Sequence, residues 1–509
     1  MNIAPESAKI AGSARRRFLI GIAAVVLLIV LFYVEEDVRG KLAWNKFKRI
    51  EEANGEKFNL ADFIPPMVPD DENFAVTPLL RAALDYEQTT NGLRWLDTNA
   101  YEHLSNIRID LGRDHAKAKA PEIGSSAPDT LIDLNVVADF YRGNTNYPQT
   151  ATPGNAAEVV LTALNKFEPD LRELREAAPS RSASRFAIDY HHEPPSAILL
   201  PHLTSVKGIS QVCDLRAVAE LADHRTADAF ADLQLGFHMA DSVRGEPFLI
   251  DHLVRLACLN AALEGVREGL ARHAWTDAEL VEFEKYLASL DLLADYKYTM
   301  RGERSLSLAN LEYFRQHRGG LIAEMSDSSQ SSGVFFNWMP GGWYRQNMLL
   351  IGECYRDYIL PSVDESNRLV LPKPGDVMMR ELAKRRMGPY NIFAKLLLPA
   401  FNKASQRSAR TQTLVDETRV ACALERYRME HHDLPDTLGA LTPKSISKIP
   451  NDLFDGNPLR YQKKTDGTYM LYSIGWNLRD DGGVPALTPG STPHDDPNNG
   501  DWVWTCPAK

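Results

Sequence analysis

The chain has 509 residues and a formal net charge of −11, and 44% of its residues are hydrophobic and 25% charged. This is the composition of a folded protein, and the length allows two or more domains. The negative charge and the lack of a basic cluster interleaved with aromatic residues exclude nucleic acid as the main partner, because phosphate binding needs a concentrated basic surface.

An uninterrupted apolar run, FLIGIAAVVLLIVLFYV, occupies residues 18–34. It lies at the short end of the roughly 17–25 residues that a membrane-spanning helix needs. Bulky Leu31, Phe32 and Tyr33 stand where a signal peptide would carry small residues for cleavage. We therefore expect an uncleaved signal anchor, with a cleaved signal peptide as the alternative.

Basic residues indicate how this segment is oriented. Arg15, Arg16 and Arg17 directly precede the apolar run and favour a cytoplasmic tail over residues 1–17, although basic residues also follow the run. We expect a single-pass protein of the bacterial inner (cytoplasmic) membrane, inserted in the lipid bilayer through residues 18–34. The bulk of the chain would lie on the extracytoplasmic side.

Residues 35–75 are predicted to form a tether. The first part continues the anchor as a charged helix to about Ala53. In the segment FIPPMVPDDENF, Pro65, Pro66 and Pro69 then enforce an extended backbone and block helix formation. The tether is thus proline-rich at its end and leads away from the membrane.

A mainly helical domain is predicted over residues 76–375. Thr77-Pro78 is a typical helix start, and Thr276 with Glu279 forms a capping box. Helical segments over 210–223, 226–243, 248–272 and 277–298 are separated by short breaks, which predicts antiparallel helical hairpins. A repeat array is the alternative, although the sequence has no strict period.

Two polar clusters in this domain are candidates for chemistry. Asp189, His191, His192 and Glu193 stand together, with His202 nearby, but no metal-site spacing is present, and a solvated or structural role is the simpler interpretation. Arg301–Arg304 is expected to form a structural ion network, with anion binding as the alternative.

Cysteines and tryptophans give weaker signals. The five cysteines contain no C-x-x-C pair, which gives no support for a zinc or thioredoxin-type site, and buried free thiols are expected at Cys213, Cys258 and Cys422. The aromatic residues around Trp338 and Trp343 are expected either to pack on the helical domain or to mark a binding site.

The C-terminal part, residues 376–509, begins with a long helix that ends near Tyr427. After Pro450 the apolar period changes to two, and Asp466-Gly467 separates two alternating runs. Asp-Gly supplies the backbone conformation of a tight hairpin. The expected order is helix, loop and β-hairpin, closed by an acidic, glycine-rich loop.

This C-terminal stretch resembles the globular domain of the type II secretion major pseudopilin over roughly 70 residues. The matching pattern is AL-x-x-Y, LPDTL, P-x-D, G-N-P-x-x-Y, then LYSIGWN and DDGG, carried by Ala423, Leu424, Tyr427, Pro450, Asp452, Gly456, Asn457, Pro458 and Tyr461. The resemblance implies a small α+β fold and contact with secretion or pilus-type machinery. The fold class expected for the whole chain is therefore mainly α, comprising a transmembrane helix, a helical middle domain and a small α+β domain.

The resemblance also implies a calcium site in the acidic loop. The ligands would come from Asp480, Asp481, Asp495 and Asp496, and carboxylate oxygens suit calcium. A loop held only by turns and hydrogen bonds is the alternative. The N-terminus departs from the family: Arg17 stands where prepilins have glycine, and no acidic residue follows until Glu35. The usual route of pilin assembly is therefore not implied.

The function expected from these patterns is that of a membrane-anchored envelope protein with a non-catalytic structural or interaction role. Other envelope proteins would be its partners. Two alternatives use the helical domain. One is an extracytoplasmic enzyme with its site at Asp189–Glu193 or Arg301–Arg304, and the other is a peptide- or glycan-binding module around Trp338 and Trp343.

Overall fold

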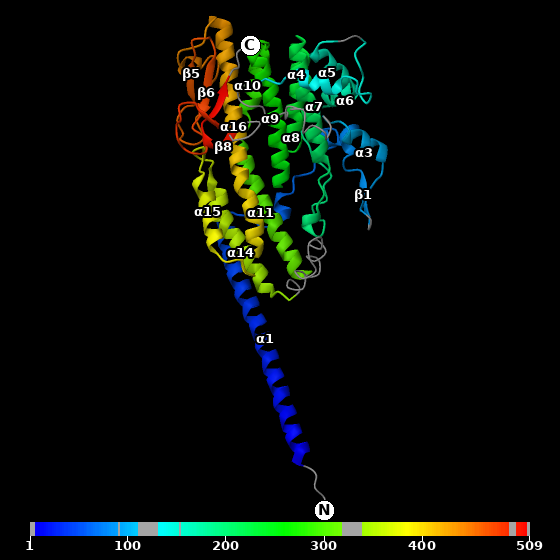
Figure 1. The fold of residues 1–509 in the computed structure, drawn as a ribbon, viewed down its shortest axis with the longest axis vertical. Coiled ribbons are helices and arrows are strands. Elements are labelled where there is room, and N and C mark those ends of the chain that lie inside the picture. Colours follow the sequence, from blue (N-terminus) through cyan, green and yellow to red (C-terminus); the bar gives the residue numbers. More distant parts are fainter. Residues whose placement is uncertain are drawn as a thin grey trace, which may run out of the picture.

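The computed structural model describes residues 6–89, 92–109, 131–151, 154–317, 338–487 and 495–505. The fold is mainly helical, with 61% helix and 8% strand. In Figure 1, helix α1 (Glu6–Ala53) projects from one end of a helical body, and the β-strands β5, β6 and β8 lie toward the opposite end. Within the described ranges, α1 is the one helix long and apolar enough to cross a membrane.

Short elements make up the first part of the body. In chain order they are η1 (Leu60–Phe63), η2 (Phe74–Val76), α2 (Pro78–Arg81), β1 (Tyr86–Thr89), β2 (Gly92–Trp95), α3 (Thr98–Ser105), α4 (Leu134–Tyr141), α5 (Ala156–Leu164), η3 (Asn165–Phe167), α6 (Glu168–Ala177) and η4 (Pro195–Ala197). Strands β1 and β2 form an antiparallel pair. Helix α5 begins with a capping box between Asn155 and Glu158.

Five longer helices form the centre of the body. They are α7 (His202–Ala222), α8 (Thr226–Ser242), α9 (Leu249–Ala271), α10 (Asp277–Ala288) and α11 (Leu292–Gln316). The predicted capping box at Thr276 and Glu279 is confirmed at the start of α10. The predicted segment 277–298 divides into α10 and α11, because Asp291 caps a new helix through the backbone N–H of Ala294.

The remaining elements begin with α14 (Gly341–Cys354), the π-helical turn η6 (Tyr355–Ile359), η7 (Leu360–Ser362), β3 (Val363–Asp364), β4 (Leu369–Val370), α15 (Lys373–Lys384) and α16 (Ile392–His431). They end with η8 (Leu438–Leu441), β5 (Arg460–Lys463), β6 (Tyr469–Ser473), β7 (Pro485–Leu487), β8 (Asp495–Gly500) and β9 (Trp502–Thr505). The predicted hairpin is present as β5–β6, with Gly467 at φ 82° in its turn. Strand β9 pairs antiparallel with β6, giving the sheet order β5-β6-β9.

Helix α16 connects the sheet to the helical body. It packs against α9, α10 and α11, and it also contacts β6 and β9. Two large hydrophobic cores result, and each takes residues from both sides of residue 375. One core joins α7–α10 to Val415, Leu424 and Leu471, and the other joins α11 and α14 to Phe393 and Trp502. The sheet and the helical body therefore share their cores.

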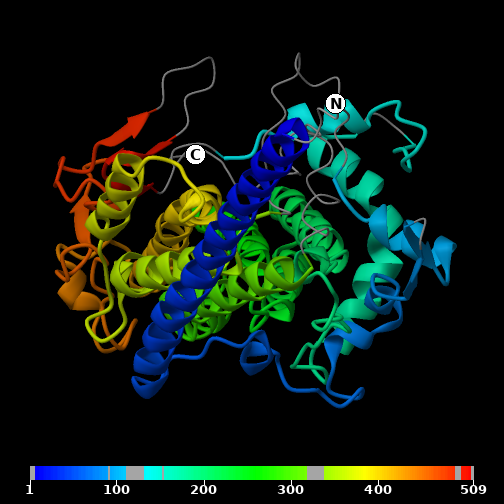
Figure 2. The same ribbon diagram turned by 90° about the horizontal axis from the view of Figure 1, so that it is seen from below.

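The region expected to be a tether packs against the body. One face of α1 is buried against α14, and its members are Glu36, Gly40, Trp44, Phe47 and Glu51. Figure 1 shows the end of α1 nearest the body beside α14, and in Figure 2, seen from below, α1 lies in front of the body. Trp44 and Phe47 are buried with Phe58 in an aromatic cluster. These apolar contacts hold residues 44–58 against the body.

Glycines bring the backbones of α1 and α14 into contact. A Cβ atom added to Gly342 would lie 1.9 Å from the carbonyl oxygen of Glu36, and one added to Gly40 would lie 2.4 Å from the carbonyl oxygen of Gly342. The Gly342 N–H also donates to the Asp37 carboxylate at 2.6 Å. Residues 36–51 are thus a fixed part of the body, whereas the apolar run before them is exposed.

Candidate functional site

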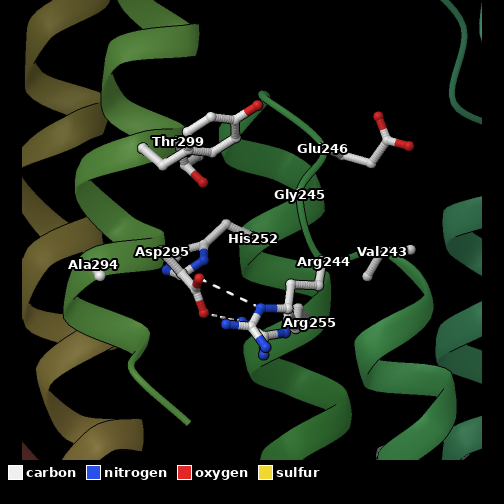
Figure 3. A pocket seen from close by; sticks show the side chains of 10 residues that line it. Val243, Arg244, Gly245, Glu246, His252, Arg255, Ala294, Asp295 and Thr299 are labelled. Atoms are coloured by element: carbon white, nitrogen blue, oxygen red, sulfur yellow. Dashed lines mark hydrogen bonds and ion pairs between the residues drawn. The ribbon is translucent and has the colours of Figure 1, made fainter. Parts of the chain in front are cut away.

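A polar pocket of about 340 Å³ lies between the α8–α9 turn, α9 and α11. Figure 3 shows its lining side chains. They are Val243, Arg244, Gly245, Glu246, His252, Arg255, Ala294, Asp295, Tyr298 and Thr299. The turn places Arg244 and Glu246 at one wall, and α11 places Asp295 opposite Arg255 of α9.

Arg255 is the buried cation of this pocket. Its side chain is 1% exposed, and its guanidinium donates to Asp295 and, at 3.0 Å, to Asp241. Burial opposes the charged form, but the two carboxylates outweigh this effect and raise the pKa of Arg255 above its ordinary value. The Tyr286 hydroxyl also donates to Asp241 at 2.9 Å. The charges at the base of the pocket are therefore compensated.

His252 lies beside this ion network as a neutral ring. Burial, together with the positive charge of Arg255, lowers the pKa of His252 to about 3. Its Nε2 shares a hydrogen bond of 2.8 Å with the Ser408 hydroxyl of α16. The ring therefore ties α9 to α16.

Glu246 is directed away from Arg255 and His252 in Figure 3. Its carboxyl group accepts a hydrogen bond from the Tyr190 hydroxyl. Burial raises the pKa of Glu246 to about 7, although Arg185 acts in the opposite direction. The group is outside hydrogen-bonding contact with the ion network and does not form an acid–base pair with His252.

The raised pKa of Glu246 predicts that stability depends on pH. A folded-state pKa above the unfolded value favours folding at low pH, and this advantage is lost as the pH rises through about 7. We expect Glu246→Gln to raise the free energy of unfolding by up to about 3 kcal/mol above that pH, and by little below the ordinary pKa of a glutamate. Urea unfolding of the full-length protein in detergent, above pH 7 and below the ordinary pKa of a glutamate, measures the free energies of unfolding of the native protein and the variant.

Glu193→Gln is the matched control for this experiment, because Glu193 is exposed on the surface nearby. It should leave the pH dependence of stability unchanged. A Glu246→Gln variant with the same pH dependence as the native protein would contradict the assignment.

The rim of the pocket offers one exposed cation to a polar group. Arg244 is half-exposed at the rim, with its Nε 3.6 Å from Asp295. It is the pocket's accessible cation, while Arg255 and His252 are engaged in buried contacts. Across the described ranges, no group of three or more His, Cys, Asp or Glu side chains gathers in a way that could hold a metal ion.

The structure divides the predicted Asp189–Glu193 cluster. Asp189 accepts from the backbone N–H of His191 and lies 3.7 Å from Nδ1 of His192 on the surface. His202 is instead buried in α7, where it stacks on Phe186 and lies 3.8 Å from Asp251 of α9. Burial lowers the pKa of His202 to about 3. The histidines therefore belong to different environments.

Arg301 and Arg304 form the expected structural ion pairs. Both bind Glu56, at 3.1 and 2.7 Å, and Arg304 also donates to the Lys57 carbonyl oxygen at 2.7 Å. Arg304 lies over the ring of Phe58, with 4.4 Å between its guanidinium carbon and the ring centroid. The segment thereby fastens α11 to the chain that follows α1.

The described carboxylates of the acidic loop are bound within their own turns. Asp480 accepts from the Gly482 N–H at 3.0 Å, Asp481 from the Asn477 amide at 3.0 Å, and Asp496 from the Asn498 N–H at 2.9 Å. Asp495 begins β8, and its side chain lies outside the described residues. Asp501, nearby, accepts from the backbone N–H groups of Asp481 and Gly483. Calcium binding stays a prediction.

The cysteines and tryptophans that the sequence singles out differ in how deeply they are buried. Cys213, Cys258 and Cys422 are buried free thiols, as expected, and so is Cys354. Cys506, Phe335 and Phe336 lie outside the described residues. Trp343 is half-buried against Phe32 and Tyr390, whereas Trp338 is 72% exposed.

Sequence reasoning missed the Arg255–Asp295 pair. The available signal was a charged residue in the apolar run HLVRLACLNAAL, on a helix expected to be buried. A buried arginine needs a carboxylate partner, but the partner is 40 residues away on another helix. Only the packing of α9 against α11 identifies it.

No family model, curated protein or solved structure matches the chain. Its function is therefore inferred from its own residues.

Proposed function

We propose that this chain is a single-pass, membrane-anchored protein of the bacterial cell envelope with a structural or interaction role. The division of α1 carries the proposal. The side chains of its apolar run, residues 18–34, are largely exposed. The face from Glu36 to Glu51 packs closely against the backbone of α14. Such a helix would attach the body to a bilayer. Because α1 is packed rigidly against α14, the tilt of the helix in the bilayer would set the orientation of the body.

The paired polar groups of the interior are the support for a structural role. The pocket at Arg255 contains compensated charges and a neutral histidine bound to Ser408. Asp189, His191 and His192 are on the surface, while His202 is buried elsewhere. These groups act in folding and packing.

We infer further that residues 376–509 form a pseudopilin-like part that contacts secretion or pilus-type machinery. The support is the ordered sequence pattern from Ala423 to Gly483, together with the succession of α16, η8 and the β5–β6 hairpin. Its partners would be other proteins of the envelope. The extracytoplasmic orientation is the one favoured by Arg15–Arg17.

Site-specific cross-linking in native membranes tests this contact. Asp436 has a side chain that is 97% exposed in the LPDTL segment, so a photo-reactive residue there should capture components of secretion or pilus-type machinery. The same residue at Asp139 of α4, which is 72% exposed, is the matched control and should not capture them. Identical adducts at both positions, or none at Asp436, would contradict the inferred contact.

A further inference from the structure

An exposed apolar and basic surface lies on the body beside the end of the membrane-spanning run. Its apolar members are Trp338 (72% exposed), Met387 (58%), Leu396 (58%) and Tyr390 (39%). Its basic members are the exposed residues Lys384, Arg385 and Arg386 and the half-buried Lys395. We call Trp338 together with residues 384–396 the juxtamembrane patch.

We propose that the juxtamembrane patch docks on the anionic surface of the same bilayer that α1 spans. The body would then be held by two contacts with the membrane, one spanning and one peripheral. This inference rests on the proposed membrane anchoring. In addition to the membrane-spanning helix, the body would have a surface that binds negatively charged lipid headgroups.

Direct contacts place the patch at the depth of the lipid headgroups. The Tyr33 hydroxyl donates to the Trp338 carbonyl oxygen, and the Tyr390 hydroxyl donates to Glu36 at 2.8 Å. Arg39 lies 5.4 Å from the centre of the Tyr390 ring. Since a helix rises 1.5 Å per residue, Arg39 is about 8 Å beyond the end of the apolar run at Val34. That distance is close to the thickness of one headgroup layer.

The fold holds this patch rigidly against α1. Asn347 of α14 donates to the Pro389 carbonyl oxygen at 2.8 Å and accepts from the Phe393 N–H at 3.0 Å. The chain between α15 and α16 is therefore fastened to the helix that packs on α1. Figure 2, which views the molecule from below, shows α15 and the first turns of α16 beside α1 on the underside.

The chemistry of the patch fits a lipid surface. Tryptophan and tyrosine are enriched where a membrane meets water, because one part of the ring system is apolar and the other polar. Basic residues next to a span attract anionic headgroups. Lys384 pairs with Glu381 at 2.7 Å, and Arg385 and Arg386 follow it as two further exposed cations. Exposed methionine and leucine side chains beside them would be covered by the same contact.

Trypsin cleavage of the full-length protein tests the proposal. The exposed bonds after Lys384, Arg385 and Arg386 should be cut rapidly in detergent and at least about tenfold more slowly in lipid nanodiscs containing phosphatidylglycerol. Cleavage after Lys464 is the internal control, because this exposed residue adjoins the β5–β6 turn at the far end of the body. Its rate should be the same in both settings, and high salt should reduce the protection of the patch.

A second variant separates docking from steric shielding by the disc. Met387→Glu combined with Leu396→Glu changes two exposed side chains and keeps the trypsin sites, so protection should be lost while the fold is retained. Equal cleavage of the native patch in detergent and in anionic discs would overturn the proposal, as would equal protection in discs of phosphatidylcholine alone. Failure of the protein to co-elute with the discs would instead overturn the membrane anchoring itself.

Discussion

Gly342→Val should lower the free energy of unfolding of the body by about 3 kcal/mol, because its side chain would overlap the backbone of α1. The atom that a Cβ would meet at 1.9 Å is the carbonyl oxygen of Glu36, which cannot rotate away as a side chain would. To make room, α1 must move off α14 and expose Trp44 and Phe47. Denaturant unfolding of the full-length protein in detergent micelles, followed by tryptophan fluorescence, measures the loss.

Gly21→Val is the control, because Gly21 lies on α1, the helix that Gly342 contacts, and a Cβ there meets nothing within 4 Å. Its unfolding midpoint should stay close to that of the native protein. Equal midpoints for the two variants would mean that the contact between α1 and α14 does not stabilise the body.

Asp232→Ala should cost about 3–5 kcal/mol of stability, since it removes the buried carboxylate that Arg175 and Arg216 share and leaves Arg216 only Glu220, at 3.5 Å, inside the body. Asp232 accepts from Nε of Arg216 at 2.7 Å and also binds Arg175, and its side chain is 1% exposed. Glu168 binds both arginines, but it is 35% exposed and cannot replace the lost charge inside the body. Circular dichroism during thermal unfolding should show a large fall in the midpoint.

The control for this network is Asp228→Ala on the same helix. Asp228 pairs with Arg225 at 2.8 Å, but both side chains are about half exposed, so the change should cost less than about 1 kcal/mol. If the two aspartate variants unfold at the same temperature, water rather than protein screens the charges around Asp232.

Local signals in the sequence predicted several elements correctly. The apolar run at 18–34 falls within one helix, Thr276 and Glu279 start α10, and Asp466-Gly467 turns the β5–β6 hairpin. Each of these signals depends on residues close together in the chain. Their physical causes, namely length, capping and turn geometry, act over a few residues.

The docking of α1 could not be predicted in the same way. Gly40 and Gly342 are separated by about 300 residues, and neither glycine alone indicates that two backbones meet. Glu36 and Glu51 lie on the buried face, so the charged residues of this helix do not indicate which side faces water. The contact between α1 and α14 leaves no trace in the local pattern of the segment predicted to be a tether.

The candidate site also depends on contacts between residues that are far apart in the sequence. The sequence drew attention to Asp189, His191 and His192 because they stand close together in the chain. In the structure these residues lie on the surface. Arg255 and Asp295 come together only because α9 packs against α11. For Asp480 and Asp481, the neighbouring turns supply hydrogen-bond donors that the sequence pattern does not specify.

The most direct test of the account is alkaline carbonate extraction of membranes from cells that make the full-length chain. The native protein should remain in the membrane pellet at its full length, because we propose that residues 18–34 form an uncleaved span. A variant with Leu27→Arg and Leu28→Arg, two exposed positions within the span, should appear in the supernatant. Release of the native protein into the supernatant, or recovery of a chain shortened at its N-terminus, would contradict the claim that α1 anchors this body to the membrane.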